Sequence, residues 1–135
     1  MDEPTVRALL QRYWEFAPID QAIAHAMYHD DAVLEFPQSQ ERFEGKANFI
    51  AWRKIYPAAV ECSIRRVCGG GDFWVAEVLI RYNGGPWNYG LTLLEFKGDK
   101  VARETIYYAE GRQAPQWRAP WRSQPSGDLP LNTAS

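Results

Sequence analysis

The sequence predicts a single α+β domain in which three N-terminal helices pack on a curved, mainly antiparallel sheet. Three observations lead to this fold class. Apolar residues recur at helical spacing in the first part of the chain, and four strand-like runs separated by glycine-containing turns follow. The length of 135 residues suffices for one hydrophobic core and is too short for two. Helices that precede the strands, instead of alternating with them, are typical of α+β proteins.

The three helices are expected over residues 5–16, 21–28 and 46–56. In each of them apolar side chains recur three and four positions apart, which places them on one helical face. Asp20 has the side chain of an N-cap for the second helix, and Pro57 closes the third. The helices are therefore predicted to bury one face each against the sheet.

The strands are expected to begin with residues 32–36, which Pro37 ends, followed by a polar loop over residues 38–45. Four longer runs are rich in β-branched and aromatic residues, as strands are. They cover residues 60–68, 73–82, 87–97 and 100–109. Glycine- and asparagine-rich turns join them, which predicts an antiparallel meander.

The C-terminal residues 112–135 contain four prolines and show no helical or strand periodicity. They are predicted to form an extended tail on a domain that covers residues 1–111. Trp117 and Trp121 are the residues that could pin this tail to the domain.

Composition excludes several functions. The net charge is −2 and no basic stripe is present, so nucleic acid is not expected as a partner. No apolar run is long enough to span a bilayer, and residues 1–4 lack the apolar segment of a signal peptide, so no membrane association and a cytoplasmic location are expected.

The spacing of cysteine and histidine matches no metal site, and no cofactor is expected. Six Trp, seven Tyr and six Phe are enough to line a pocket as well as a core.

Four segments carry a resemblance to a known superfamily: residues 11–13, 29–37, 43–45 and 103–108. In this order of elements they resemble the SnoaL-like, nuclear transport factor 2-like proteins, which include ketosteroid isomerase and polyketide cyclases. The resemblance covers residues 5–110. It implies a cone-shaped α+β barrel of the cystatin-like kind, and it indicates the function only weakly because this fold supports many reactions.

The isomerase pattern carries over only in part. Its first-helix tyrosine, a donor to the oxygen that gains charge, matches Tyr13. Its general-base aspartate falls on Phe36, and its second aspartate falls near Thr92. Since phenylalanine cannot accept a proton, the resemblance does not imply isomerase chemistry through that position.

Strand alternation, with its phase set by the resemblance, predicts which side chains face the interior of the cone. Glu104 lies on the inner face of residues 100–109 between Ala102 and Ile106. A carboxyl in such surroundings should be protonated or hydrogen-bonded, and it is a candidate general acid or base. The alternative is a structural pairing of Glu104 with an arginine or a tyrosine hydroxyl. Predicted substrate-binding residues are Phe36, Trp52, Trp74, Val78, Asn88, Thr92 and Tyr108.

Two functions remain open at this stage. One is an enzyme that binds a small, mostly apolar molecule and catalyses cofactor-free cyclisation, isomerisation or dehydration, with Glu104 moving the proton and Tyr13 stabilising the oxygen. The other is a non-catalytic domain: a ligand-binding or dimerising domain, or the small regulatory subunit of a larger complex. Trp87, Tyr89, Leu91 and Leu93 leave the outer face of the sheet apolar, and in the superfamily this face often forms a homodimer.

Overall fold

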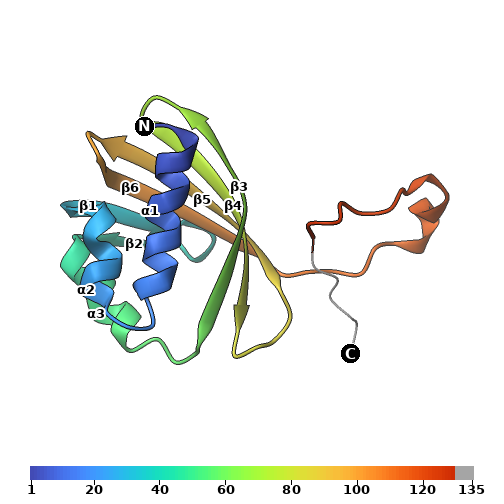
Figure 1. Ribbon diagram of the computed structural model, residues 1–135. Helices are drawn as coiled ribbons and strands as arrows, with labels where there is room; N and C mark the ends of the chain where they lie inside the picture. The colour runs from blue at the N-terminus through green and yellow to red at the C-terminus, as the bar shows by residue number, and fades with distance from the viewer. Residues whose placement is uncertain (130–135) are drawn as a thin grey trace.

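Six strands form one curved sheet in the computed structural model, which describes residues 1–129 (Figure 1). The strand order is β2-β1-β6-β5-β4-β3. The strands are β1 (Tyr28–Phe36), β2 (Glu41–Glu44), β3 (Val60–Gly70), β4 (Phe73–Tyr82), β5 (Asn88–Lys97) and β6 (Lys100–Ala109). Neighbours pair antiparallel except β1 and β6, which are parallel. The predicted meander of four long strands and the α+β class are confirmed.

Each of the first two helices follows an aspartate N-cap; the first begins at Glu3, two residues before its predicted start, and the second begins where it was predicted. In α1 (Glu3–Phe16) the Asp2 carboxylate accepts a hydrogen bond from the Thr5 amide at 2.9 Å. In α2 (Gln21–Ala24) the Asp20 carboxylate accepts from the amides of Ala22 and Ile23, as expected for a cap. These caps satisfy amides that have no partner within the helix.

The second helix is shorter than predicted. It ends at Ala24, a 3-10 turn over His25–Met27 follows, and β1 begins at Tyr28 instead of residue 32. Tyr28 pairs with Val101 of β6, and the register then shifts before Val33. Pairing with a strand more than seventy residues away has overridden the local helical pattern here.

The predicted loop over residues 38–45 contains a strand. After a 3-10 turn, Pro37–Ser39, the chain reverses through Gln40, whose φ of 58° is left-handed, and β2 pairs with β1. The third helix, α3 (Lys46–Lys54), follows β2 and ends two residues before the predicted end. The helices therefore do not all precede the sheet, because β1 and β2 come before α3.

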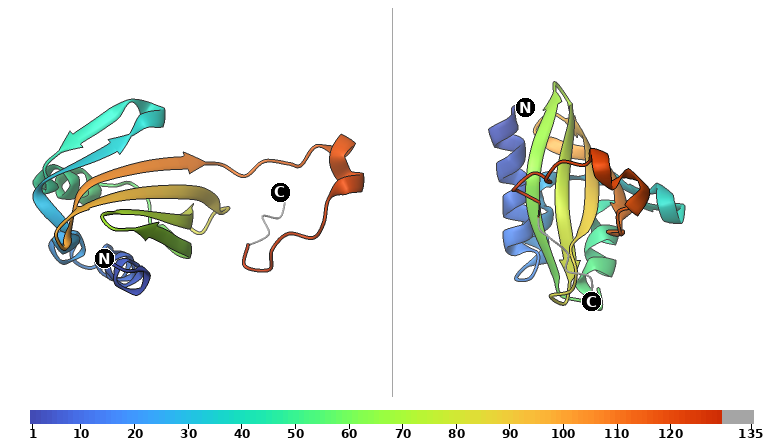
Figure 2. Two further views of the ribbon diagram at one scale, coloured as in Figure 1. Left: turned by 90° about the horizontal axis from the view of Figure 1, so that it is seen from above. Right: turned by 90° about the vertical axis from the view of Figure 1, so that its right-hand side faces the viewer.

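The main core lies between the helices and the inner face of the sheet. In Figure 1, α1 runs across one face of the sheet, with α2 and α3 near the edge formed by β1 and β2. Figure 2 shows β1 and β2 diverging from β3 and β4 at the opposite edge, so that the sheet opens like a cone. Buried apolar side chains from every layer fill its closed end, among them Val6, Leu34, Phe49, Leu94 and Val101.

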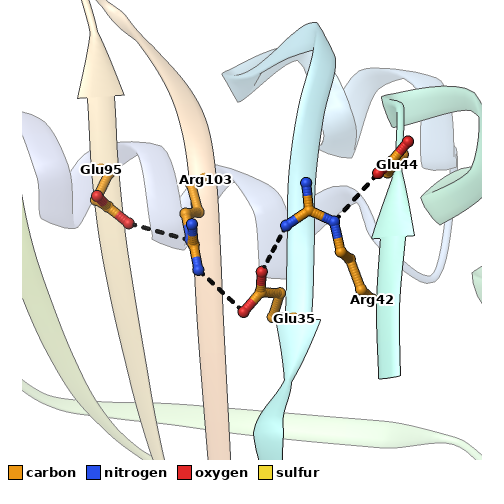
Figure 3. A network of polar contacts seen from close by, with 5 residues as sticks. All are labelled: Glu35, Arg42, Glu44, Glu95 and Arg103. Atoms are coloured by element: carbon orange, nitrogen blue, oxygen red, sulfur yellow. Dashed lines mark hydrogen bonds and ion pairs between the residues drawn. The ribbon is translucent and has the colours of Figure 1, made fainter. Parts of the chain in front are cut away.

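The outer face of the sheet carries a row of ion pairs across four strands (Figure 3). The Glu35 carboxylate accepts from Arg42 at 2.8 Å and from Arg103 at 3.0 Å. Arg42 also contacts Glu44, and Arg103 contacts Glu95 at 3.5 Å. Glu35 thus points away from the interior of the cone.

The tail leaves the body of the domain after β6 and includes a 3-10 turn over Gln116–Trp121 (Figures 1 and 2). Trp117 and Trp121 are 74% and 78% exposed, so they do not pin the tail to the domain. An ion pair fixes its return instead, since the Asp128 carboxylate lies 2.8 Å from Nε of Arg65 on β3. Residues 130–135 of the predicted tail lie outside the described residues.

Candidate functional site

A cavity of about 1060 Å³ opens between the helices and the inner face of the sheet. Its walls come from α1, β1, α3 and the middle of β4, β5 and β6. Aromatic rings form much of the lining, and they contact one another in a chain from Phe43 through Trp52 and Phe36 to Tyr108. A cavity of this size and lining suits a small, largely apolar molecule.

Glu104 of β6 lies at the inner end of this cavity and is only 4% exposed. Tyr28, a residue only 1% exposed, donates a hydrogen bond from its hydroxyl to the Glu104 Oε1 atom, and Thr92 of β5 supplies a second hydrogen bond. Burial raises the pKa of Glu104, while Arg53 and the two hydrogen bonds act in the opposite direction. The net direction is upward, which suits a carboxyl that exchanges protons near neutral pH.

Arg53 and His25 form the second half of the polar group. Nη1 of Arg53 donates to Nε2 of His25 at 3.0 Å and lies 3.5 Å from the Tyr28 hydroxyl. His25 is fully buried, and its Nδ1 bonds the Gln21 carbonyl oxygen at 2.7 Å. Nδ1 therefore carries the proton and Nε2 accepts. Burial, together with Arg53, lowers the pKa of His25 to about 4, so this histidine is neutral at pH 7. Its Nε2 lone pair is occupied by the hydrogen bond from Arg53 and is not available to a substrate proton.

Tyr13 of α1 lines the same cavity, and burial raises the pKa of its hydroxyl. Within residues 1–129 no hydrogen-bond partner lies at this hydroxyl. Tyr28, in contrast, has its proton committed to Glu104. Of the two tyrosines, Tyr13 is thus the one whose donor is available to an oxygen atom of a bound molecule.

The structure places most of the predicted site residues in one cavity. Those that line it are Tyr13, Phe36, Trp52, Val78, Thr92, Glu104 and Tyr108. Asn88 instead lines a smaller neighbouring hollow at the start of β5, shared with Phe36 and Tyr108. The catalytic and binding roles of these residues stay predictions.

Trp74 does not line the cavity, and the expectation that it forms a wall is wrong. It lies at the start of β4, beside the β3–β4 turn, and is buried in the core. Its indole Nε1 donates to the Gly71 carbonyl oxygen at 2.9 Å. Strand alternation correctly placed Trp74 on the inner face of the sheet. It could not predict the position of Trp74 along the strand, which lies in the packed core and not beside the cavity.

Comparison with known proteins agrees with this geometry. The SnoaL-like domain family matches residues 6–104. This chain belongs to that family. A solved NTF-2 like protein of unknown function from Burkholderia xenovorans LB400 shares 35% sequence identity, with a TM-score of 0.80 over 91% of this chain and 97% of that one. No curated protein sequence matches the chain.

Two further solved structures share the fold of this SnoaL-like domain. One is described as a putative ketosteroid isomerase from Kribbella flavida DSM 17836, with 22% identity and a TM-score of 0.80 over 97% of this chain and 98% of that one. The other is described as a putative SnoaL-like polyketide cyclase from Jannaschia sp. CCS1, with 16% identity and a TM-score of 0.66 over 78% and 86%. Identities this low establish the fold alone.

Sequence reasoning missed two members of the polar group in this SnoaL-like domain, Tyr28 and Arg53. Helical spacing could have found Arg53, because it follows the fully buried Phe49 by four positions and so shares its face of α3. Period-two alternation extended back from Leu34 and Ala32 reaches Tyr28, but the polar run His29–Asp31 hides the signal.

The described part of the chain contains neither a membrane-spanning helix nor a cluster of metal-binding side chains. Within residues 1–129, no helix combines the length and apolar character needed to cross a bilayer. In the same range, no three side chains of His, Cys, Asp or Glu lie close enough together to hold a metal ion.

The raised pKa of Glu104 predicts a pH-dependent stability difference. A carboxyl whose folded-state pKa lies above the ordinary value of about 4.3 stabilises the fold below that pH, and the contribution is lost as the pH rises through the folded-state pKa. Glutamine does not ionise. The free energy of unfolding of Glu104→Gln, relative to wild type, should therefore increase from pH 4 to pH 8 in urea titrations. His25 is present in both proteins, so its own titration cancels when the two free energies of unfolding are subtracted. If this difference did not change between pH 4 and pH 8, the raised pKa of Glu104 would be contradicted.

Proposed function

We propose that this SnoaL-like domain binds a small, mostly apolar molecule in the aromatic cavity and catalyses cofactor-free proton transfer on it, in a reaction of the cyclisation, isomerisation or dehydration class. The observation that carries the proposal is the buried Glu104 carboxyl at the inner end of the cavity, held by the Tyr28 hydroxyl. A cytoplasmic location, expected from the sequence, is part of the same proposal.

Each residue has a distinct part in this chemistry. Glu104 in its ionised form removes a proton from a carbon next to a carbonyl group, and the electron pair of the C–H bond moves toward the carbonyl oxygen. Tyr13 donates a hydrogen bond to that oxygen as it gains charge. Glu104, now protonated, returns the proton to the same or another carbon. Tyr28 and Thr92 hold the carboxyl in place throughout.

The experiment uses 2-tetralone, a bicyclic ketone that fits the proposed size and carries acidic C–H bonds. Wild-type protein in D₂O should accelerate deuterium incorporation next to the carbonyl over the buffer rate, as followed by proton NMR. Affinity for the same ketone is measured separately through quenching of tryptophan fluorescence. Acceleration supports the proposal, and saturable binding at the buffer rate refutes the catalytic part of it.

The second candidate function is a non-catalytic ligand-binding domain, and one observation favours it. Phe36, at the position of the general-base aspartate in the isomerase resemblance, contributes an aromatic wall in place of a base. For this function, native mass spectrometry of the purified protein would show a co-purified small molecule that survives incubation unchanged.

We further propose that the outer face of the sheet forms a homodimer. Leu91 and Tyr107 are cross-strand partners on this face, and both are exposed although large and apolar. Leu91→Glu should convert the dimer to a monomer in sedimentation velocity. Ile55→Glu, at an exposed apolar position after α3, is the matched control and should remain dimeric. A wild-type protein that sediments as a monomer would refute the dimer.

A further inference from the structure

Arg53 is held rigidly at the cavity wall. Its Nη1 bonds His25 and approaches the Tyr28 hydroxyl, as described above. Its guanidinium carbon lies 5.2 Å from the ring centroid of Trp52, 5.5 Å from that of Tyr13 and 5.9 Å from that of Phe49. Three aromatic faces and two polar contacts fix the orientation of the group, so little ordering entropy remains to be lost when a ligand binds it.

This guanidinium has no carboxylate partner in the part of the chain that the structure describes, where no Asp or Glu oxygen lies within 4.0 Å of it. Six other arginines of the domain each form an ion pair with a carboxylate, whereas Arg12, exposed on α1, forms none within residues 1–129; the six are Arg7, Arg42, Arg65, Arg66, Arg81 and Arg103. Arg53 differs from all of them in its surroundings, since it lines the cavity. A positive charge that is partly withdrawn from water is costly when no opposite charge contacts it.

The groups around Arg53 do not supply the missing charge. His25 is neutral and accepts its hydrogen bond as an uncharged imidazole. The carboxyl of the cavity, Glu104, makes no direct contact with Arg53, because the Tyr28 hydroxyl lies between them, and the two charges interact only at longer range. The other charged lining residues, Asp20, Glu41 and Lys54, are exposed to solvent, which screens their charge.

Part of the guanidinium remains available to a ligand. Only Nη1 makes hydrogen bonds to residues 1–129, so Nε and Nη2 keep their N–H donors free of protein acceptors in that range. Arg53 is only partly buried, and it lines the cavity. A planar guanidinium with adjacent free donors matches the two oxygens of a carboxylate.

We propose that the ligand of this cavity is an apolar, ring-containing acid whose carboxylate pairs with Arg53, while its apolar part lies against the aromatic wall formed by Phe36, Phe43, Trp52 and Tyr108. This inference rests on the proposed binding function and adds the chemical class of the ligand to it. The competing role for Arg53 is purely structural, to hold His25 and Tyr28, and it predicts no preference for anions.

The experiment compares 2-naphthoate with its neutral amide, 2-naphthamide, by isothermal titration calorimetry at pH 7.5. The two probes share the ring system and differ in charge. Wild-type protein should bind 2-naphthoate about ten- to hundredfold more tightly, in keeping with hydrogen bonds to a charged group. Arg53→Gln should abolish this preference while affinity for 2-naphthamide changes by less than about threefold. Arg12→Gln removes the same charge from an exposed position of α1 outside the cavity lining and should keep the wild-type preference.

Arg53→Lys covers the case in which Arg53→Gln fails to fold, as judged by circular dichroism. It keeps the charge and loses the planar fork, so the preference should fall at least threefold with 2-naphthamide binding retained. Equal affinity of wild type for both probes, or an unchanged preference in Arg53→Lys, would overturn the inference and leave the cavity proposal standing. Binding of neither probe, nor of 2-tetralone, would remove the proposed binding function itself.

Discussion

The Glu104→Gln variant is expected to lower the enzyme-dependent rate of deuterium incorporation into 2-tetralone by at least about 100-fold, the usual contribution of a positioned general base. Glutamine keeps the size of the side chain and can still accept the hydrogen bond from Tyr28, but it does not take up a proton. Affinity for 2-tetralone, measured by fluorescence quenching, should therefore stay within about threefold of wild type, because the cavity keeps its shape.

Glu95→Gln is the matched control for this experiment. Glu95 belongs to β5, is exposed, and pairs with Arg103 on the outer face of the sheet (Figure 3). Its substitution should leave the exchange rate unchanged. If Glu104→Gln retained the wild-type rate, Glu104 would not be the base; if it lost both the rate and the affinity, the residue would serve the shape of the cavity and not the chemistry.

Gly69→Ala is expected to destabilise the fold by more than about 3 kcal/mol, because the added methyl group meets backbone that has no room to move. An ideal Cβ at Gly69 would lie 2.3 Å from the Phe73 carbonyl oxygen and 2.7 Å from the Trp74 Cα atom. The φ of this residue is 156°, a conformation that residues with a side chain rarely adopt. Urea unfolding followed by far-ultraviolet circular dichroism measures the loss.

The neighbouring glycine provides the comparison. A Cβ at Gly70 meets no atom within 4 Å, and its φ lies outside the positive range, so Gly70→Ala should change the free energy of unfolding by no more than about 1 kcal/mol. Equal effects of the two substitutions would contradict this prediction. They would show that the backbone at Phe73 and Trp74 can shift to make room for a side chain at position 69.

The long strands were predictable because their pattern and their turns agree. Runs of β-branched and aromatic residues end at glycines, and the observed bounds of β4 and β6 coincide with the predicted ones. The α1 helix was predictable because its apolar face lies within one short stretch of chain, although it begins at Glu3, two residues earlier than predicted. Where local signals agree with each other, tertiary contacts only reinforce them.

The errors lie where a distant partner decides the local conformation. β1 begins at Tyr28 because β6 offers a parallel partner there, and β2 forms in a polar segment because β1 supplies its hydrogen bonds. Neither partner can be recognised from the residues concerned. The tail was misjudged in the opposite direction: Trp117 and Trp121 have the character of anchors, but no part of the described domain packs against them closely enough to bury them.

The candidate site divides in the same way. The alternation of β6, with its phase set by the family resemblance, correctly placed Glu104 toward the interior, and the same resemblance singled out Tyr13. Tyr28, His25 and Arg53 come from three further elements, and the hydrogen bonds that join them exist only once those elements have packed.

By itself, the sequence determined the α+β class and the four-strand meander, because both depend on periodicity over a few neighbouring residues. With the phase of the strand set by the family resemblance, it also placed a carboxyl on the inner face of the last strand. Only the tertiary structure decided what surrounds that carboxyl: a tyrosine from β1, a threonine from β5 and an arginine from α3. Burial and contact between distant segments set the pKa and the charge of such a group, and these quantities are properties of the packed chain.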